Sequence, residues 1–106
     1  MKVTGKRVQG FPLIAVDEQP LDPLPSLKLR NHSPDGFNWG YSGSGPAQFA
    51  LALMLKAGIP EAVALERYQD FKRDVIARLP DEFSMELIFY PDGSWHANVT
   101  QGSTHA

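Results

Sequence analysis

The hydrophobic pattern predicts one helix that is apolar on every side. Between residues 47 and 57 only Gln48 and Lys56 are polar. Pro46 suits the first turn of this helix, and Gly58 suits its end. A helix that is apolar all round must be covered all round. A sheet and a second helix can each cover one side, so we expect a loop, a second subunit or a target protein to cover the rest.

A second helix is predicted from about residue 61 to residue 79, because Pro80 cannot continue it. One of its faces is apolar at helical spacing, and the opposite face is charged. The apolar face consists of Leu65, Tyr68, Phe71, Val75, Ile76 and Leu79. One cluster is expected to be buried between the two helices and the sheet: Leu51, Leu55, Phe71 and Val75.

Two Pro-Asp-Gly tripeptides predict two β-hairpins. In such a turn Pro presets φ, Asp bonds to the local backbone, and Gly supplies a positive φ. Both tripeptides lie between segments whose side chains alternate as in strands. The predicted hairpins join residues 27–32 with 37–41 and residues 85–90 with 94–99. Weaker strand patterns cover residues 2–8 and 13–17.

The remaining segments complete the predicted fold. Residues 18–26 contain three prolines and are expected to form an extended surface connector. Residues 100–106 are polar and are expected to form a disordered tail. Residues 1–106 are therefore predicted to form one α+β domain. It has a mainly antiparallel sheet of two or three hairpins, with two helices packed on one face.

Composition and charge restrict the classes of function. The 106 residues carry a net charge of −2, whereas nucleic-acid modules usually carry a clustered basic excess. The chain has no cysteine, which excludes disulfides and cysteine metal sites and fits the cytoplasm. The uncharged span of residues 36–55 is interrupted by glycine and proline, so no membrane helix is predicted. We expect no cofactor, no membrane contact and no nucleic-acid partner.

A glycine-rich turn at residues 40–46 leads into the first predicted helix. Backbone N–H groups at such a helix start can hold an anion. The candidate anion-binding residues are Ser42, Gly43, Ser44 and Gly45. The spacing fits neither a P-loop nor a dinucleotide fingerprint, so a tight structural turn is the favoured interpretation. Gly43 or Gly45 is then expected to adopt a positive φ, or to lie where a Cβ would clash with a neighbouring backbone.

Reactive side chains give weaker hypotheses. His32 and Asp35 can be assembled into a hydrolytic group, but no nucleophile elbow accompanies them. The three histidines lack the spacing of metal ligands, so no metal site is predicted. No catalytic residue is assigned.

Aromatic residues cluster on and beside the two predicted hairpins. Stacking on bases needs interleaved basic residues, which are scarce here. Trp and Tyr dominate the energetics of many protein interfaces. We therefore predict that Trp39, Tyr41 or Trp95 anchors a protein partner or a homodimer.

The segment from Leu27 to Leu53, which reads LKLRNHSPDGFNWGYSGSGPAQFALAL, carries a family resemblance. Together with residues 68–72 and 75–77 it resembles a family of short proteins catalogued only as a domain of unknown function. Members of that family occur in bacteria and archaea and on phages and plasmids. They usually end soon after one final strand, whereas this chain carries a full second hairpin. The resemblance implies a small cytosolic accessory protein from a mobile element, and it supplies no catalytic residue.

These observations favour a small non-enzymatic protein that acts by protein–protein contact in the cytoplasm. The resemblance extends this to a phage or mobile-element inhibitor of a host defence complex such as CRISPR. The alternative is a domain that binds a small anion or a nucleotide at the Gly40–Pro46 turn. A weaker alternative is a small hydrolase.

Overall fold

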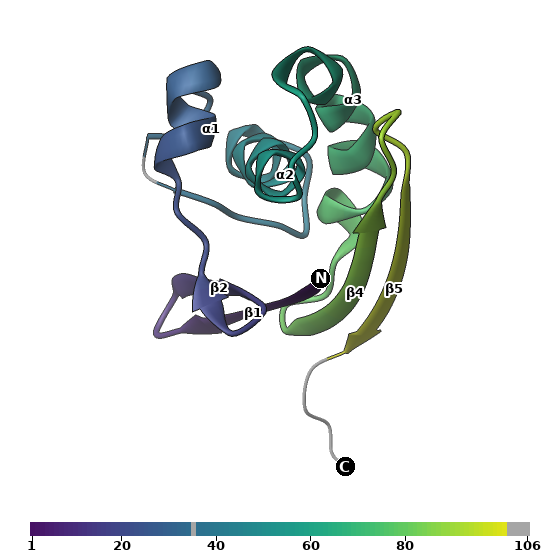
Figure 1. Ribbon diagram of the computed structural model, residues 1–106. Helices are drawn as coiled ribbons and strands as arrows, with labels where there is room; N and C mark the ends of the chain where they lie inside the picture. The colour runs from purple at the N-terminus through teal and green to yellow at the C-terminus, as the bar shows by residue number, and fades with distance from the viewer. Residues whose placement is uncertain (35, 102–106) are drawn as a thin grey trace.

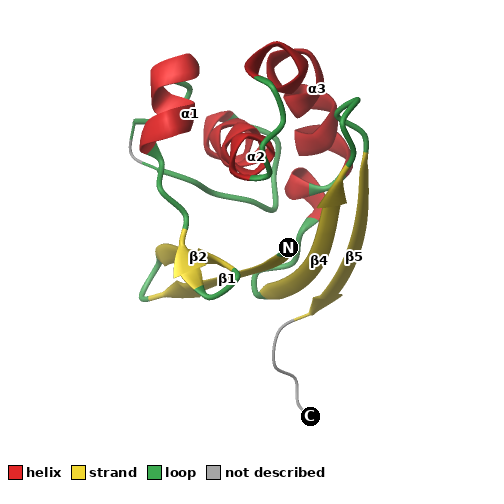
Figure 2. Ribbon diagram, viewed as in Figure 1, coloured by secondary structure: helices red, strands yellow, loops and turns green. Residues whose placement is uncertain are grey.

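The computed structural model describes residues 1–34 and 36–101. Over these residues the chain forms three strands, then a group of helices, then two further strands of the same sheet (Figures 1 and 2). The strands are β1 (Lys2–Val8), β2 (Phe11–Val16), β3 (Gln19–Pro20), β4 (Phe83–Phe89) and β5 (Trp95–Gln101). The helices are α1 (Leu24–Leu29), α2 (Ser44–Lys56) and α3 (Glu61–Asp74), followed by the 3₁₀ turn η1 (Ile76–Arg78). The α+β prediction is confirmed.

The sheet is antiparallel throughout, in the order β3-β2-β1-β4-β5. The N-terminal strand β1 lies at its centre because Val3 pairs with Val16 on one side and with Met85 on the other. Side chains alternate between the two faces of a strand. Val3 and Gly5 of β1 are buried on one face of the sheet, Gly5 under the Phe83 ring, whereas Lys2 and Lys6 are exposed on the opposite face. We call this opposite face the outer face of the sheet.

Helix α2 occupies the centre of the fold. Figure 1 shows it between α1 and α3, with the sheet along the other side. Residues 45–54 of α2 are all buried. The expected buried cluster is confirmed in part: Leu51 and Phe71 are fully buried, whereas Leu55 and Val75 are half-buried. The chain itself covers the side of α2 for which a second subunit or a target protein was considered, because α1 lies there.

Helix α1 corrects the first predicted hairpin. Residues 24–29 form a helix, so residues 27–32 are not a strand, and no strand forms over 37–41 among the described residues. The connector prediction for residues 18–26 is wrong for residues 24–26, which belong to α1, whereas residues 19 and 20 are extended and form β3. Proline suits a first helical turn because its missing N–H has no helical partner there. The Leu24 N–H donates to the Asp22 carboxylate over 3.0 Å, which anchors this helix start.

The second predicted helix is shorter than its apolar pattern. α3 ends at Asp74, Val75 adopts non-helical dihedrals, and η1 follows. Leu79 is extended (φ −67°, ψ 141°), as expected for a residue before proline. Ile76 and Leu79 still reach the core, and the Ile76 carbonyl accepts the N–H of Gly40 over 3.0 Å.

The C-terminal hairpin is confirmed. Tyr90 donates its N–H to the carbonyl of Ser94 over 2.8 Å, and the Asp92 carboxylate accepts the N–H and hydroxyl of Ser94. These bonds hold the pKa of Asp92 below its usual value. The tail prediction is wrong for residues 100 and 101, which continue β5 opposite Ser84 and Phe83. Residues 102–106 lie outside the described residues.

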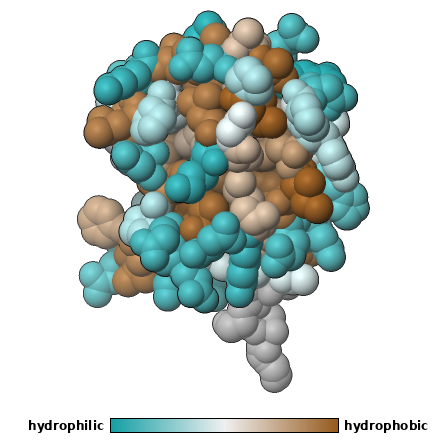
Figure 3. All heavy atoms as spheres, in the orientation of Figure 1, coloured by the Kyte–Doolittle hydropathy of each residue, from teal (hydrophilic) through white to brown (hydrophobic). Residues whose placement is uncertain are grey.

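The molecular surface mixes polar and apolar side chains. In Figure 3 apolar side chains reach the surface at the centre of the viewed face, with polar side chains around them. Within residues 1–34 and 36–101, no helix combines the length and the apolar character needed to cross a membrane.

Candidate protein-contact surface

Trp39, one of the three predicted contact residues, lies in the core. Its side chain is fully buried, and its ring packs edge-to-face on Phe83 with 5.3 Å between ring centroids. The indole N–H donates to the carbonyl of Pro80 over 2.9 Å, which satisfies its one polar group. The folded chain therefore leaves no part of Trp39 for a partner, and the prediction for this residue is wrong.

Arg7 of β1 holds the backbone around Trp39 in place. Its guanidinium donates to the side-chain oxygen of Asn38 over 2.6 Å and to the carbonyl of Trp39 over 3.0 Å. The guanidinium carbon lies 4.3 Å from the Trp39 ring centroid, which is a cation–π geometry. Arg7 also forms an ion pair with the exposed Asp81. A charged strand residue thus joins three distant segments of the chain.

The other two predicted anchors are at least partly accessible, and Trp95 lies far from Trp39. Tyr41 is 49% exposed, and its ring lies over Gly43. Trp95 is half-buried, with its ring 5.2 Å from that of Phe71. Trp95 pairs with Phe89 at the far end of β4, roughly 20 Å along the strand from Phe83, on which Trp39 packs. The structure does not gather the predicted aromatics into one surface.

The glycine turn leads into α2, as predicted, but its glycines serve packing. Gly43 is the N-cap with an extended φ of −177°. A Cβ on Gly45 would lie 2.8 Å from the Cβ of Asn38 and 3.2 Å from its backbone N. The close approach is therefore confirmed at Gly45. The other expected alternative, a positive φ, is found at neither Gly43 nor Gly45, whereas Gly40 has a φ of +87°.

The same geometry bears on the anion hypothesis for Ser42, Gly43, Ser44 and Gly45. An anion at a helix start needs free backbone N–H groups. Pro46 has none, the Ala47 N–H already donates to the Gly43 carbonyl over 3.0 Å, and Gly45 is buried. Few amides remain for a ligand, so the geometry favours a structural turn.

Replacing Gly45 with alanine should lower the free energy of unfolding by about 1–3 kcal/mol, because the new methyl group meets the Asn38 backbone. Urea denaturation measures this loss, and the exposed Ser42→Ala is the control.

Sulfate stabilises folded proteins in general, so the anion test compares the effect of sulfate on the wild type with its effect on a variant. If sulfate raises the melting temperature of the wild type more than that of Ser42→Ala, the anion hypothesis gains over the structural one.

Gln48 anchors the segment that carries His32. It is fully buried in α2, and its side-chain oxygen accepts the N–H groups of His32 over 2.7 Å and Ser33 over 3.1 Å. Its amide group donates to the carbonyl of Arg30 over 3.0 Å. The polar exception in an apolar helix thus satisfies three backbone groups of the loop after α1.

His32 is held against the buried hydroxyl of Tyr68, with 2.6 Å between the Nε2 and Oη atoms. Burial lowers the pKa of His32, and the charges of Arg30 and Lys72 lower it further. Asp35, its predicted hydrolytic partner, lies outside the described residues. No three His, Asp or Glu side chains gather for a metal ion within the described part of the chain.

The lowered pKa of His32 predicts a pH-dependent stability. The folded state favours the neutral ring, so its stabilising contribution is complete above the ordinary value of 6.5 and decreases as the pH falls below it. Between about pH 7.5 and pH 5 the melting temperature of the wild type should fall further than that of His32→Gln, which does not titrate. Equal falls in the two proteins would contradict this assignment.

The β1–β2 hairpin, one of the weaker strand patterns in the sequence, carries the most exposed of the large apolar side chains, Phe11, and two further exposed ones. Phe11 is 71% exposed, Leu13 50% and Val8 46%. Val8 pairs directly with Phe11, and Leu13 pairs with Lys6. All three lie on the outer face, which no described helix covers. We call Val8, Phe11 and Leu13 the hairpin patch.

The turn of this hairpin explains why the patch escaped the sequence analysis. Gln9 and Gly10 both have positive φ, at 52° and 84°, as a two-residue type I′ turn requires. The usual signature of that turn is Asn-Gly or Asp-Gly. Recognising Gln9-Gly10 as a weaker version would have placed Val8 and Phe11 side by side on one face.

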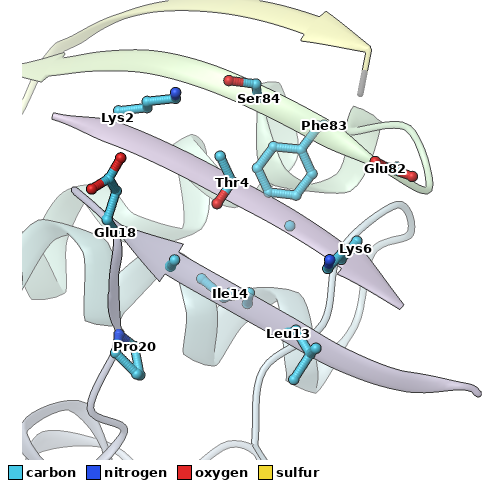
Figure 4. Close-up of a pocket in the computed structure, with 12 residues that line it drawn as sticks. Lys2, Thr4, Lys6, Leu13, Ile14, Glu18, Pro20, Glu82, Phe83 and Ser84 are labelled. Atoms are coloured by element: carbon cyan, nitrogen blue, oxygen red, sulfur yellow. The ribbon is translucent and has the colours of Figure 1, made fainter. Parts of the chain in front are cut away.

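A shallow hollow adjoins the hairpin patch. It measures about 550 Å³ and lies along β1, with Leu13 at its side (Figure 4). Its other lining residues include Thr4, Lys6, Glu18, Pro20, Glu82 and Ser84. Charged side chains lie at both ends of the hollow, Lys2 and Glu18 at one end and Lys6 and Glu82 at the other, near Leu13 (Figure 4). This arrangement suits a partner that presents an apolar side chain framed by polar groups.

The fold and this surface define an α+β domain with three exposed apolar side chains side by side on one hairpin. The chain belongs to the family of unknown function DUF6166, whose match spans residues 3–88. The match ends within β4, so β5 lies beyond it. Neither the curated proteins nor the solved structures contain a match to the chain.

Proposed function

We propose that this chain is a non-enzymatic protein that acts by protein–protein contact through the hairpin patch. The observation that carries the proposal is the exposure of Phe11 at 71%, with Val8 and Leu13 beside it on an uncovered sheet face. Contiguous exposed apolar patches are rare on monomeric proteins, and where they occur they often mark a contact site. A contact surface at residues 8–13 replaces the predicted aromatic anchor Trp39.

The energetics support a contact of useful strength. Full burial of a Val, Leu or Phe side chain contributes about 1.5–3 kcal/mol. Scaled by the observed exposures, covering the hairpin patch would contribute roughly 2.5–5 kcal/mol. That is enough to change an affinity by between about 60-fold and about 4,000-fold. The patch is thus able to act as the centre of an interface, with Lys6, which pairs with Leu13, at its rim.

The test compares the partners retained by matched variants. The double variant Phe11→Ser and Leu13→Ser removes the patch from an exposed surface. Ile88→Ser is the control, because Ile88 is 52% exposed on β4 of the same outer face. Wild type and variants are immobilised, exposed to lysate, and compared by mass spectrometry.

A protein retained by the wild type and by Ile88→Ser, but lost with the double variant, would support the proposal. Equal retention of every protein by all three, with unchanged circular dichroism, would overturn it. All the substituted residues lie on the outer face of the sheet, so the result does not depend on whether the glycine turn binds an anion.

The proposed setting is the cytoplasm, in keeping with a chain that has no cysteine. The family resemblance supports a partner within a host defence complex such as CRISPR, for a protein carried by a phage or another mobile element. The experiment is an interference assay against a targeted plasmid. Wild type should reduce interference and the double variant at Phe11 and Leu13 should not. Equal interference with and without the wild type would remove this partner class.

A further inference from the structure

Strand β5 forms one edge of the sheet, and along its outer side no strand of residues 1–34 and 36–101 pairs with it. Its pairing with β4 is set by the hydrogen bond from Tyr90 to Ser94 at the turn. Bonding alternates along an antiparallel strand. His96, Asn98 and Thr100 therefore bond to β4. The residues between them direct their backbone N–H and C=O groups away from the sheet: Trp95, Ala97, Val99 and Gln101.

The two edges of the sheet differ in how they are protected. Proteins commonly block edge pairing with charged residues, with proline or with very short strands. At one edge β3 is two residues long, and the part of β2 beyond it contains Pro12. At the other edge β5 is seven residues long and contains no proline, no glycine, and no Asp, Glu, Lys or Arg. This second edge is open to another strand.

We propose that a second copy of this chain pairs antiparallel along β5, so that the two sheets become one. Centring the twofold axis on Asn98 places all seven residues of β5 opposite a partner residue. Trp95 then exchanges hydrogen bonds with the partner's Gln101, and Ala97 with the partner's Val99, giving about eight bonds across the interface. In this register the bonds between the two copies come from the backbone N–H and C=O groups of residues 95, 97, 99 and 101, which do not bond to β4.

The side chains favour a second copy over a foreign strand. On the helix side of the sheet, Val99 is 38% exposed and Ala97 is half-buried. The register places Val99 of one copy opposite Ala97 of the partner subunit, so the two apolar side chains cover each other. On the outer side, Asn98 faces Asn98 of the partner subunit. Since β5 carries no Asp, Glu, Lys or Arg, self-pairing brings no like charges together. Because β5 has no Asp, Glu, Lys or Arg, it cannot form ion pairs that would make it specific for a charged foreign strand.

This pairing is independent of the hairpin patch, because β1 and β4 separate β2 from β5 in the sheet. The dimer would carry one hairpin patch at each end of the joined sheet. Each chain has one open edge, so the association closes at two copies.

The first experiment measures mass by light scattering across micromolar concentrations. The wild type should approach twice the chain mass of 11.7 kDa. Ala97→Pro removes an outward N–H that β4 does not use, so the variant should keep its fold and lose the dimer. Ile88→Ser on the outer face is the control and should remain dimeric. A monomeric wild type, or a dimer that survives Ala97→Pro, would overturn the proposal.

The second experiment tests the register. The chain has no cysteine, so a single introduced cysteine reports one position. Asn98→Cys places two thiols across the axis, at a Cα separation of about 4.5 Å that a disulfide can span. Mild oxidation should therefore produce a covalent dimer. His96→Cys is the control, because His96 faces the partner's Thr100. Equal yields of covalent dimer from the two variants would contradict the register.

Discussion

Replacing Trp39 with alanine is expected to lower the free energy of unfolding by about 3–5 kcal/mol. The side chain is fully buried, and its ring lies against Phe83 and Phe49, with centroid separations of 5.3 and 6.3 Å. Its removal leaves a cavity, takes the ring from beneath Arg7, and leaves the Pro80 carbonyl without its indole donor. A small domain has only about 5–15 kcal/mol of total stability, so most of the molecules could unfold on mild warming.

Urea denaturation followed by circular dichroism measures this loss. Trp39→Phe should lose less, because it keeps an aromatic ring in the cluster. Trp95→Ala is a matched control, since Trp95 is only half-buried at the sheet edge. A loss below about 1 kcal/mol for Trp39→Ala would show that the ring is not part of the core.

Replacing Gln48 with methionine should lower the free energy of unfolding by about 3–5 kcal/mol. Methionine matches the length of glutamine, so little cavity forms, and the effect comes from lost hydrogen bonds. The change leaves the N–H groups of His32 and Ser33 and the carbonyl of Arg30 without their partner. An unsatisfied buried polar group costs about 1–3 kcal/mol.

Hydrogen exchange separates this mechanism from a general loss of stability. The amides of His32 and Ser33 should exchange faster in Gln48→Met than the amides of the β4 ladder. Gln69→Met on α3 is the control, because Gln69 is only half-buried. Unchanged exchange at His32, with full stability retained, would show that water or another group satisfies the segment equally well.

The contact surface has a different relation to stability from these two residues. Phe11 and Leu13 are exposed, so their replacement by serine should leave the free energy of unfolding within about 0.5 kcal/mol of the wild type. A change that weakens partner capture without changing stability is what the proposed function requires. Trp39→Ala cannot provide that separation, because it acts on the fold.

Local patterns were sufficient for the parts of the fold whose cues are close together in sequence. The apolar run with Pro46 in its first turn fixed α2, and the period of the next segment fixed the start of α3. The Pro-Asp-Gly turn at residues 91–93 fixed the hairpin of β4 and β5. In each case the turn chemistry and the side-chain periodicity agreed, and tertiary contacts did not have to choose between alternatives.

Local sequence patterns were enough to predict the α+β class, the two main helices and the C-terminal hairpin. Which apolar residues are covered depends instead on tertiary contacts. The spacing of the aromatic residues predicted a strand at residues 37–41, but these residues form a loop. Arg7, 31 residues from Asn38 in the sequence, bonds to Asn38 and holds that loop over the core. Helix α1 likewise depends on a place beside α2, where Gln48 bonds to Arg30. Burial depends on contacts between distant residues, so Trp39 became core and Phe11 became surface although both are large and aromatic.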